Sequence, residues 1–171
     1  MSVPSRVLIP ALALMFGVIS PVLAQDVVPG SGLLGVYFTD QTLSAVGAVH
    51  KGEAITKDWG NGSPDPKISS DNFSARWLGS LIAPTTGTYT LTLRTDDGSR
   101  LWVGGVLLID KWILQGPTEW SATVDLVAGE PVPLKYEFYE NGGGAVAQLS
   151  WTGQASRSSW CRCRPSRCRS M

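Results

Sequence analysis

Two adjacent carboxylates, Asp96 and Asp97, mark the point in this sequence where chemically active side chains are most concentrated. They lie at a sharp turn, and Asp97 is followed by Gly98. An Asp-Gly pair is typical of β-hairpin turns, so one interpretation is purely structural. Asp96 is not explained in that way, because neighbouring carboxylates repel each other unless a cation or a hydrogen-bond donor lies between them. A cation site is the second interpretation, and the turn alone does not decide between the two.

The residues on both sides of this turn have the pattern of β-strands. Residues 88–95 alternate between apolar and polar side chains, as expected for a half-buried strand. After the turn, residues 100–103 and 106–109 form two short apolar runs. They are joined by Gly104 and Gly105, which can both take positive φ in a tight turn. The acidic turn is therefore predicted to lie within a β-meander.

The rest of the chain also reads as short strands separated by turns. Strand patterns occur in five further stretches, namely 33–38, 75–82, 120–126, 132–139 and 145–151. Residues 39–72 are instead rich in loop signals, most clearly at 60–66. Only the first residues of the chain show a long apolar run. Several short strands at close spacing predict an all-β fold, an antiparallel β-sandwich or barrel.

The N-terminal segment has the pattern of a secretory signal peptide. Arg6 precedes the apolar run 7–19, and small residues lead up to Ala24. We expect cleavage between Ala24 and Gln25, because the apolar run is too short to span a membrane. Residues 25–31 would then be a short linker before a single domain, 32–151. An exported protein meets abundant calcium, and extracellular calcium modules work with a Kd of roughly 10⁻⁴–10⁻³ M.

The C-terminal residues 152–171 differ in composition from everything before them. They contain all three cysteines and five of the 14 basic residues, whereas residues 25–151 hold eight basic and all 14 acidic residues, a formal charge of −6. A zinc site does not fit, because the cysteine spacing matches no standard pattern. A basic arm for anionic polymers remains an alternative. We favour an out-of-frame end, because an odd number of cysteines is unusual in an exported protein.

Five short motifs, in this order, resemble the protective antigen fourteen domain family. They are 32–38 (GLLGVYF), 73–79 (FSARWLG), 87–90 (GTYT), 96–102 (DDGSRLW) and 139–145 (YENGGGA). The resemblance covers residues 31 to 151, nearly the whole exported part. Members of this family occur in bacterial toxins, glycosidases, proteases and yeast adhesins, and the resemblance implies an antiparallel β-sandwich or barrel.

The same resemblance implies a calcium site. In sugar-binding members, two consecutive aspartates joined by a cis peptide hold Ca²⁺, and an asparagine on a later loop completes the site. This pattern corresponds to Asp96, Asp97 and Asn141, with a backbone carbonyl of the glycine loop, assigned to Gly143, as a further ligand. Carboxylate, amide and carbonyl oxygens are the ligands that calcium takes. The ion would then hold sugar hydroxyls directly.

The tryptophans divide into two groups by their neighbours in the sequence. Trp77, Trp102 and Trp151 fall within apolar strand patterns, so we expect them in the core. Trp59 and Trp112 have polar or loop neighbours and are candidates for stacking on a sugar ring, and Trp112 joins Asp96, Asp97 and Asn141 as a predicted glycan contact. The residues of the glycine loop 142–144 carry no side chain that could set sugar specificity.

The residue inventory argues against catalysis. His50 is the single histidine and lies in the early loop stretch, so no convincing Ser/His/Asp arrangement can be built. Asp58 and Glu119 could be imagined as a glycosidase pair, but with 14 acidic residues such pairs arise readily. We also find no phosphate-binding glycine loop.

Two functional hypotheses follow from the sequence. The first is a secreted or cell-surface module, periplasmic or surface-attached in a bacterium, that binds glycans or polysaccharide through calcium and neither binds nucleic acid nor inserts into membranes. The second is a structural or interaction module, or a detached accessory domain of a glycosidase, in which calcium only stabilises loops. Sugar specificity and oligomeric state stay open at this point.

Overall fold

The computed structural model describes residues 32–155, and the predicted signal peptide, linker 25–31 and most of the arginine- and cysteine-rich tail lie outside them. The described part is built from β-strands without helices. The strands are β1 (Leu33–Phe38), β2 (Val46–Glu53), β3 (Thr56–Gly60), β4 (Phe73–Ile82), β5 (Gly87–Asp96), β6 (Gly98–Val103), β7 (Val106–Lys111), β8 (Thr118–Leu126), β9 (Pro131–Glu140) and β10 (Ala145–Ala155).

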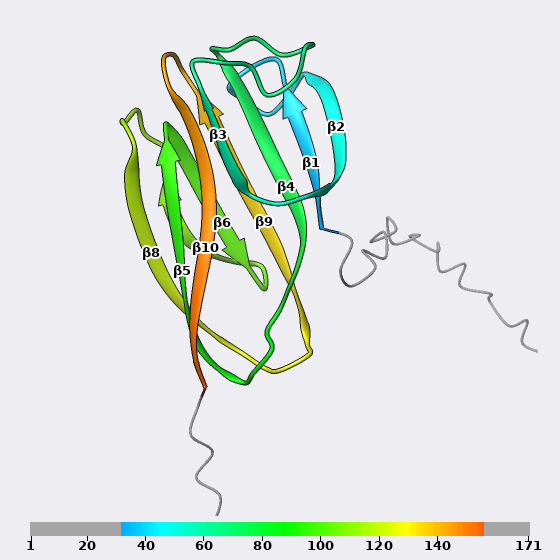
Figure 1. The fold of residues 1–171 in the computed structure, drawn as a ribbon, viewed down its shortest axis with the longest axis vertical. Coiled ribbons are helices and arrows are strands. Elements are labelled where there is room, and N and C mark those ends of the chain that lie inside the picture. The colour runs from blue at the N-terminus through cyan, green and yellow to red at the C-terminus, as the bar shows by residue number, and fades with distance from the viewer. Residues whose placement is uncertain (1–31, 156–171) are drawn as a thin grey trace, which may run out of the picture.

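These strands form two antiparallel sheets packed face to face, as Figure 1 shows. One sheet has six strands in the order β2-β1-β4-β9-β6-β7, and the other has four in the order β3-β10-β5-β8. The predicted all-β sandwich is thereby confirmed. Within the described residues, no helix is long and apolar enough to cross a membrane.

The core lies between the sheets and follows from side-chain alternation. In β5, Leu91 and Leu93 point inward and are fully buried, while Thr90 and Thr92, which alternate with them, face outward. The six-stranded sheet contributes large aromatic side chains to the same core, among them Phe73, Trp77 and Phe138. Apolar side chains from both inner faces therefore interdigitate in a single layer, as is typical of sandwiches.

Two strands, β2 and β3, lie within the stretch 39–72 that was predicted to be loop-rich, so that prediction was wrong in part. Both are edge strands, β2 beside β1 and β3 beside β10. An edge strand has one free side and tolerates polar residues and glycine, which weaken the alternation signal. The remaining part of the stretch, 61–72, is irregular as expected.

Of the three tryptophans predicted in the core, only Trp77 is there, fully buried. Trp102 lies on the outer face of β6, where the Nζ of Lys135 sits 3.5 Å from its ring centroid. Trp151 is 38% exposed near the end of β10. The strand pattern places both correctly in strands, but it does not say which face or which end of a strand is covered.

Trp59, predicted to be free for stacking on sugar, is instead engaged with the core. Its ring stacks on Trp77 at 6.5 Å between centroids and meets Phe73 edge-on at 5.6 Å. Its neighbours Asp58 and Gly60 are exposed on edge strand β3, and this explains why the sequence suggested an exposed ring. Trp59 closes the core at the sheet edge.

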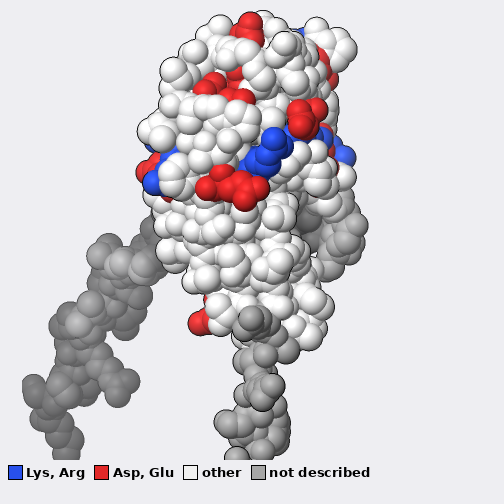
Figure 2. All heavy atoms as spheres, turned by 60° about the vertical axis from the view of Figure 1, so that its left-hand side comes forward, with Lys and Arg blue, Asp and Glu red and all other residues white. Residues whose placement is uncertain are grey.

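Charge is unevenly distributed over the side of the molecule that carries the four-stranded sheet. Figure 2 shows acidic and basic side chains in the upper part of this view, toward the end where β5 terminates, and a mainly uncharged lower part. The outward row of β5 accounts for the contrast, since Thr88, Thr90 and Thr92 precede Arg94 along the strand. Arg94 lies 3.9 Å from Asp58, so this acid belongs to a surface ion pair.

Candidate metal site

The two aspartates lie where the chain crosses from one sheet to the other. β5 ends at Asp96 in the four-stranded sheet, and β6 begins at Gly98 in the six-stranded sheet. The two strands are not hydrogen-bonded neighbours, so the interpretation of Asp97-Gly98 as a hairpin turn was wrong. The peptide bond between Asp96 and Asp97 is cis, as the family resemblance implies. The hairpin predicted at Gly104 and Gly105, by contrast, joins β6 to β7, and both glycines have positive φ.

A second crossing lies directly beside the first. β9 ends at Glu140 in the six-stranded sheet, and after the glycine loop β10 begins at Ala145 in the four-stranded sheet. Because β6 pairs with β9 and β5 pairs with β10, the ends of all four strands meet. Sheet pairing therefore brings residue 140 next to residues 96 and 97.

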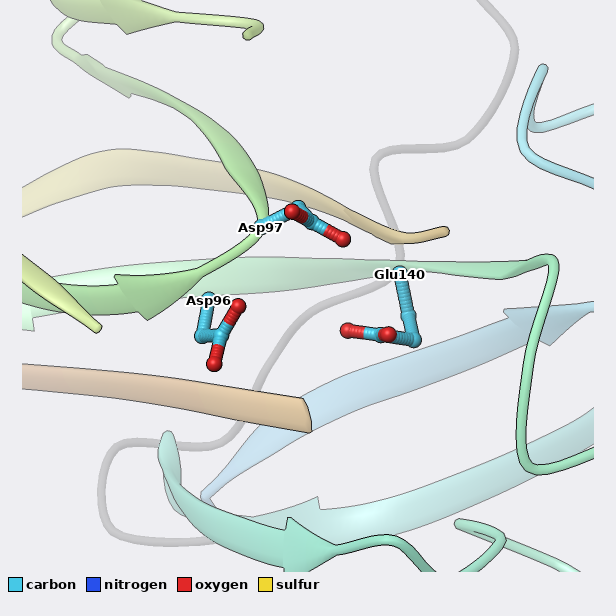
Figure 3. A group of neighbouring side chains, drawn as sticks. All are labelled: Asp96, Asp97 and Glu140. Atoms are coloured by element: carbon cyan, nitrogen blue, oxygen red, sulfur yellow. The ribbon is translucent and has the colours of Figure 1, made fainter. Parts of the chain in front are cut away.

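Three carboxylates converge at this junction, as Figure 3 shows. One ligand oxygen from each of Asp96, Asp97 and Glu140 lies within 4.8 Å of the others. Asp97 is 4% exposed and Glu140 is fully buried, while Asp96 is half-buried. Buried carboxylates at such spacing need a cation or protons to offset their charge.

Asp97 is held in place by backbone and side-chain donors. The backbone amides of Gln115 and Asn141 donate to its two carboxylate oxygens at 3.1 and 2.9 Å. Its carbonyl oxygen accepts from the Gln115 side-chain amide at 3.0 Å and from the Thr95 hydroxyl at 2.9 Å. Asp97 is therefore fixed in orientation, with its negative charge facing the junction.

Glu140 has the opposite environment. Neither of its carboxylate oxygens has a hydrogen-bond partner among the described residues. Burial, then the charges of Asp97 and Asp96, raises the pKa of the Glu140 carboxyl to about 8. The backbone amide of Gly142 lowers this pKa to a smaller extent, although it forms no hydrogen bond to either carboxylate oxygen of Glu140. A buried, unpartnered carboxylate that faces two others is suited to hold a hard cation.

Asp96 lies closer to solvent than the other two carboxylates. Burial raises the pKa of its carboxyl, the charge of Asp97 raises it further, and Arg94 lowers it. Asp96 and Asp97 line a pocket of about 510 Å³, together with Leu114, Gln115, Gly116, Asn141, Gly142 and Gly144. A cation held by the carboxylates would thus remain reachable from solvent.

The other predicted ligands lie at this junction in different roles. Asn141 lines the pocket, and its side-chain oxygen accepts a hydrogen bond from Gln41 at 3.0 Å. Gly143 has positive φ, and its amide donates to Asp71 at 3.2 Å. Its neighbours Gly142 and Gly144, rather than Gly143 itself, line the pocket.

Trp112, predicted to stack on a sugar, is packed between protein groups. Its ring lies 4.8 Å from that of Tyr139 and 4.5 Å from the guanidinium carbon of Arg100. Trp112 does not line the pocket, whereas Leu114 on the same loop does and is 68% exposed. The ring of Trp112 braces the loop that carries Gln115 and Leu114. Arg100 also pairs with Asp110 at 3.1 Å.

The sequence interpretation missed Glu140 although it lies inside one of the recognised motifs. Tyr136 and Phe138 are buried on the inner face of β9, and Glu140 shares their parity in the strand. An acidic residue at an inward position was therefore a readable signal. Gln115 carried no comparable signal, because its contacts to Asp97 depend on how the loop after β7 folds back.

His50 and the other acidic residues form separate groups. The two ring nitrogens of His50 lie 3.2 Å from Glu53 and 2.9 Å from Asp65. Burial opposes ionisation of Glu53, but hydrogen bonds from Lys57, Tyr37 and Trp77 outweigh it and hold the pKa of that carboxyl below its ordinary value. These residues tie β2 and β3 to the core.

Fold and sequence together place this chain in a family. The PA14 (protective antigen fourteen) domain family matches residues 29–159, so the chain belongs to it. Anti-sigma-I factor RsgI3 of Acetivibrio thermocellus is 42% identical over 128 residues, which is 75% of this chain. This chain spans 20% of the length of that relative.

Solved structures show the same architecture. An anti-sigma factor domain-containing protein superimposes with a TM-score of 0.71 at 42% identity, over 72% of this chain and 43% of that one. A second, from Clostridium clariflavum, gives 0.69 at 31% identity over 72% and 42% of the two chains. The PA14 sugar-binding domain from an RTX adhesin gives 0.59 at 18% identity, over 72% and 90%, and shares the fold.

Proposed function

We propose that this domain is a non-catalytic recognition module that binds calcium through Asp96, Asp97, Glu140 and Asn141 and uses the ion to bind carbohydrate outside the cytoplasm. The observation that carries the proposal is Glu140, a fully buried carboxylate without a partner that faces two further carboxylates. An arrangement of this kind is costly for a purely structural turn.

The donor set fits calcium in its chemistry. Calcium takes six to eight oxygen ligands, and the junction offers three carboxylates and an amide oxygen. Carbonyl oxygens of the loop 141–144 and water would complete the set. When bound, the ion would offer open positions to hydroxyl oxygens of a ligand.

The pocket supports a carbohydrate as that ligand. It opens beside the carboxylates, and Leu114 adds an exposed apolar side chain at its rim, where the apolar face of a sugar ring could rest. Two solved relatives of the same fold are a sugar-binding domain from an RTX adhesin and the epithelial adhesin 9 A domain from Candida glabrata in complex with Galβ1-4GlcNAc. Both are less than 20% identical to this chain, so they support the fold and make a sugar a reasonable first ligand to test.

A second candidate is an interaction module in which calcium only stabilises loops. Three relatives above 30% identity are anti-sigma factor proteins, and their names do not mention a sugar. In addition, Trp112 is packed against Arg100 and Tyr139 and does not line the pocket. A detached accessory domain of a glycosidase is a variant of this second candidate. The chain would then correspond to one part of an enzyme such as the β-glucosidase from Kluyveromyces marxianus, because the match covers 16% of the length of that enzyme.

A glycan array probed with and without a calcium chelator separates the two candidates. The proposal predicts binding of the full-length chain in millimolar calcium, loss of binding in chelator, and loss in Asp96→Asn. Asp110→Asn, which removes an exposed acid on β7, is the matched control and keeps binding. If calcium is taken up but no glycan binds in any condition, the interaction module is the correct function.

A further inference from the structure

We propose that Gln41 is a positioning residue of the calcium site, which orients the side chain of Asn141 and fixes the chain at Glu140. This inference rests on the proposed calcium site and concerns a residue far from it in the sequence. Gln41 lies in the turn between β1 and β2, about a hundred residues before its partners at the site.

The side-chain nitrogen of Gln41 joins three segments of the chain. Its two N–H groups are shared among three acceptors, the side-chain oxygen of Asn141 at 3.0 Å, the carbonyl oxygen of Glu140 at 3.2 Å and the side-chain oxygen of Asn72 at 3.1 Å. Residue 72 immediately precedes β4, residue 140 is the last residue of β9, and residue 141 begins the loop after it. One side-chain amide thus connects the loops around the carboxylates.

The turn that carries Gln41 is itself well ordered by hydrogen bonds. The carboxylate of Asp40 accepts from the hydroxyl and backbone amide of Thr42 and from the backbone amide of Ala45, each at 2.6 Å. The Thr42 hydroxyl bond, with the further bonds from Ala45 and Ser44, holds the pKa of Asp40 well below its usual range. The Ser74 hydroxyl at the start of β4 donates to the carbonyl of Asp40. The backbone of the turn that carries Gln41 is therefore held in one conformation by hydrogen bonds.

The hydrogen bond to Asn141 has a specific chemical consequence. An amide oxygen has two acceptor positions, so the Asn141 oxygen can accept from Gln41 and still coordinate a cation. The bond also orients the Asn141 side-chain amide, because the Gln41 nitrogen is a donor and therefore needs the Asn141 oxygen, not its nitrogen, as partner. Interactions of this kind orient metal ligands, and their loss typically lowers metal affinity about 10–100-fold.

Terbium(III) provides the test, because it takes oxygen ligands as calcium does and its luminescence decay in H₂O and D₂O reports the number of bound waters. The experiment compares the full-length chain with Gln41→Met, Asn141→Ala and the double variant. Gln148→Met, a glutamine on β10 that lines a different pocket, is the matched control. Melting temperature in chelator is measured for each variant.

The proposal predicts that Gln41→Met weakens terbium and calcium binding about 10–100-fold and adds about one bound water, as in Asn141→Ala. The double variant is expected to lose less affinity than the two single losses combined, because Gln41 acts in part through Asn141 and in part through its bond to the Glu140 carbonyl. Unchanged affinity and hydration in Gln41→Met, with normal uptake by the unchanged chain, would overturn the role of Gln41 alone. No terbium or calcium uptake by the unchanged chain would overturn the proposed function as well.

A structural role without an effect on the ligands is distinguished by the melting temperature. If Gln41→Met lowers the melting temperature in chelator while the number of bound waters stays as in the unchanged chain, Gln41 supports the fold only, and the proposal is wrong. Gln41→Glu keeps the size of the side chain but replaces the donor by an acceptor. It is expected to resemble Gln41→Met in hydration number.

Discussion

Glu140 distinguishes the candidate metal site from an ordinary acidic turn, because Asp96 and Asp97 each have a compensating environment and Glu140 has none. Asp97 is satisfied by two backbone amides, and Asp96 reaches solvent. Glu140 is buried without a partner, and its pKa lies about 8 instead of near 4.5. Without a bound cation, and at a pH between these two values, the Glu140 carboxyl is therefore protonated in the folded protein and ionised in the unfolded chain.

The raised pKa predicts how stability depends on pH when no metal is bound. Between about pH 4.5 and pH 8 the folded state binds more protons at Glu140 than the unfolded state, so the free energy of unfolding falls as pH rises. Urea unfolding in chelator at pH 5.5 and 7.5 measures this. Glu140→Gln is expected to flatten the dependence, whereas Glu119→Gln, an exposed acid on β8, keeps it. Equal slopes in all three proteins would contradict the assignment.

At the residue scale, the sequence predicted the aspartates better than their surroundings. The two consecutive aspartates can be recognised directly in the sequence, and Asn141 lies in one of the recognised family motifs, 139–145. The clamp on Asp97 by Gln115 depends on a loop returning from β7, and the bond from Gln41 spans 100 positions. Neither contact leaves a local pattern, because the partners meet only after both sheets have formed.

At the element scale, the site is a product of sheet pairing. The pattern of residues 88–95 and 100–103 predicted two strands correctly, but a hairpin was the wrong connection between them. Whether consecutive strands pair or change sheets depends on which partners are available, here β9 for β6 and β10 for β5. Alternation describes one strand at a time and does not contain this information.

Gly98 is the point where this crossing tolerates no side chain. A Cβ at residue 98 would lie 2.1 Å from the ring of Tyr139, which packs on Trp112 and precedes Glu140. Gly98→Ala is expected to lower the free energy of unfolding by about 1–3 kcal/mol, because the ring must move. Chemical denaturation measures this, with Gly116→Ala, which meets open space, as the control. Equal stability of the two variants would contradict this prediction, because it would show that the Tyr139 ring can move aside without lowering the free energy of unfolding.

Trp59 anchors edge strand β3, which also pairs with β10, on the core. The ring contacts Trp77 and Phe73, so Trp59→Ala is expected to cost about 3 kcal/mol of stability in chelator. Trp151→Ala removes a side chain of the same kind that is 38% exposed, and it should cost clearly less. Thermal unfolding of the two variants compares them. A smaller loss for Trp59→Ala than for Trp151→Ala would restore the sequence-based assignment of these rings.

At the scale of the whole molecule, the sandwich separates a core that holds the fold from one end where three carboxylates converge. The all-β class and most strands were predictable, because alternation and turn residues are local signals. The edge strands β2 and β3 were missed because their sequences, VGAVHKGE and TKDWG, are rich in polar residues and glycine, whereas the edge strands β7 and β8 kept a readable pattern. The mainly uncharged lower part of the face in Figure 2 contrasts with the upper part, which carries acidic and basic side chains, toward the end where β5 and β9 terminate.

Calorimetric titration of the full-length chain with calcium tests the proposed site most directly. We predict one calcium ion per chain with a Kd of roughly 10⁻⁴–10⁻³ M, and about 2.7 kcal/mol of added stability at a calcium concentration of 100 Kd. Glu140→Gln should bind much more weakly, and Asp110→Asn should bind normally. No calcium uptake at millimolar concentration, or unchanged uptake in Glu140→Gln, would contradict a calcium site built around the buried carboxylate.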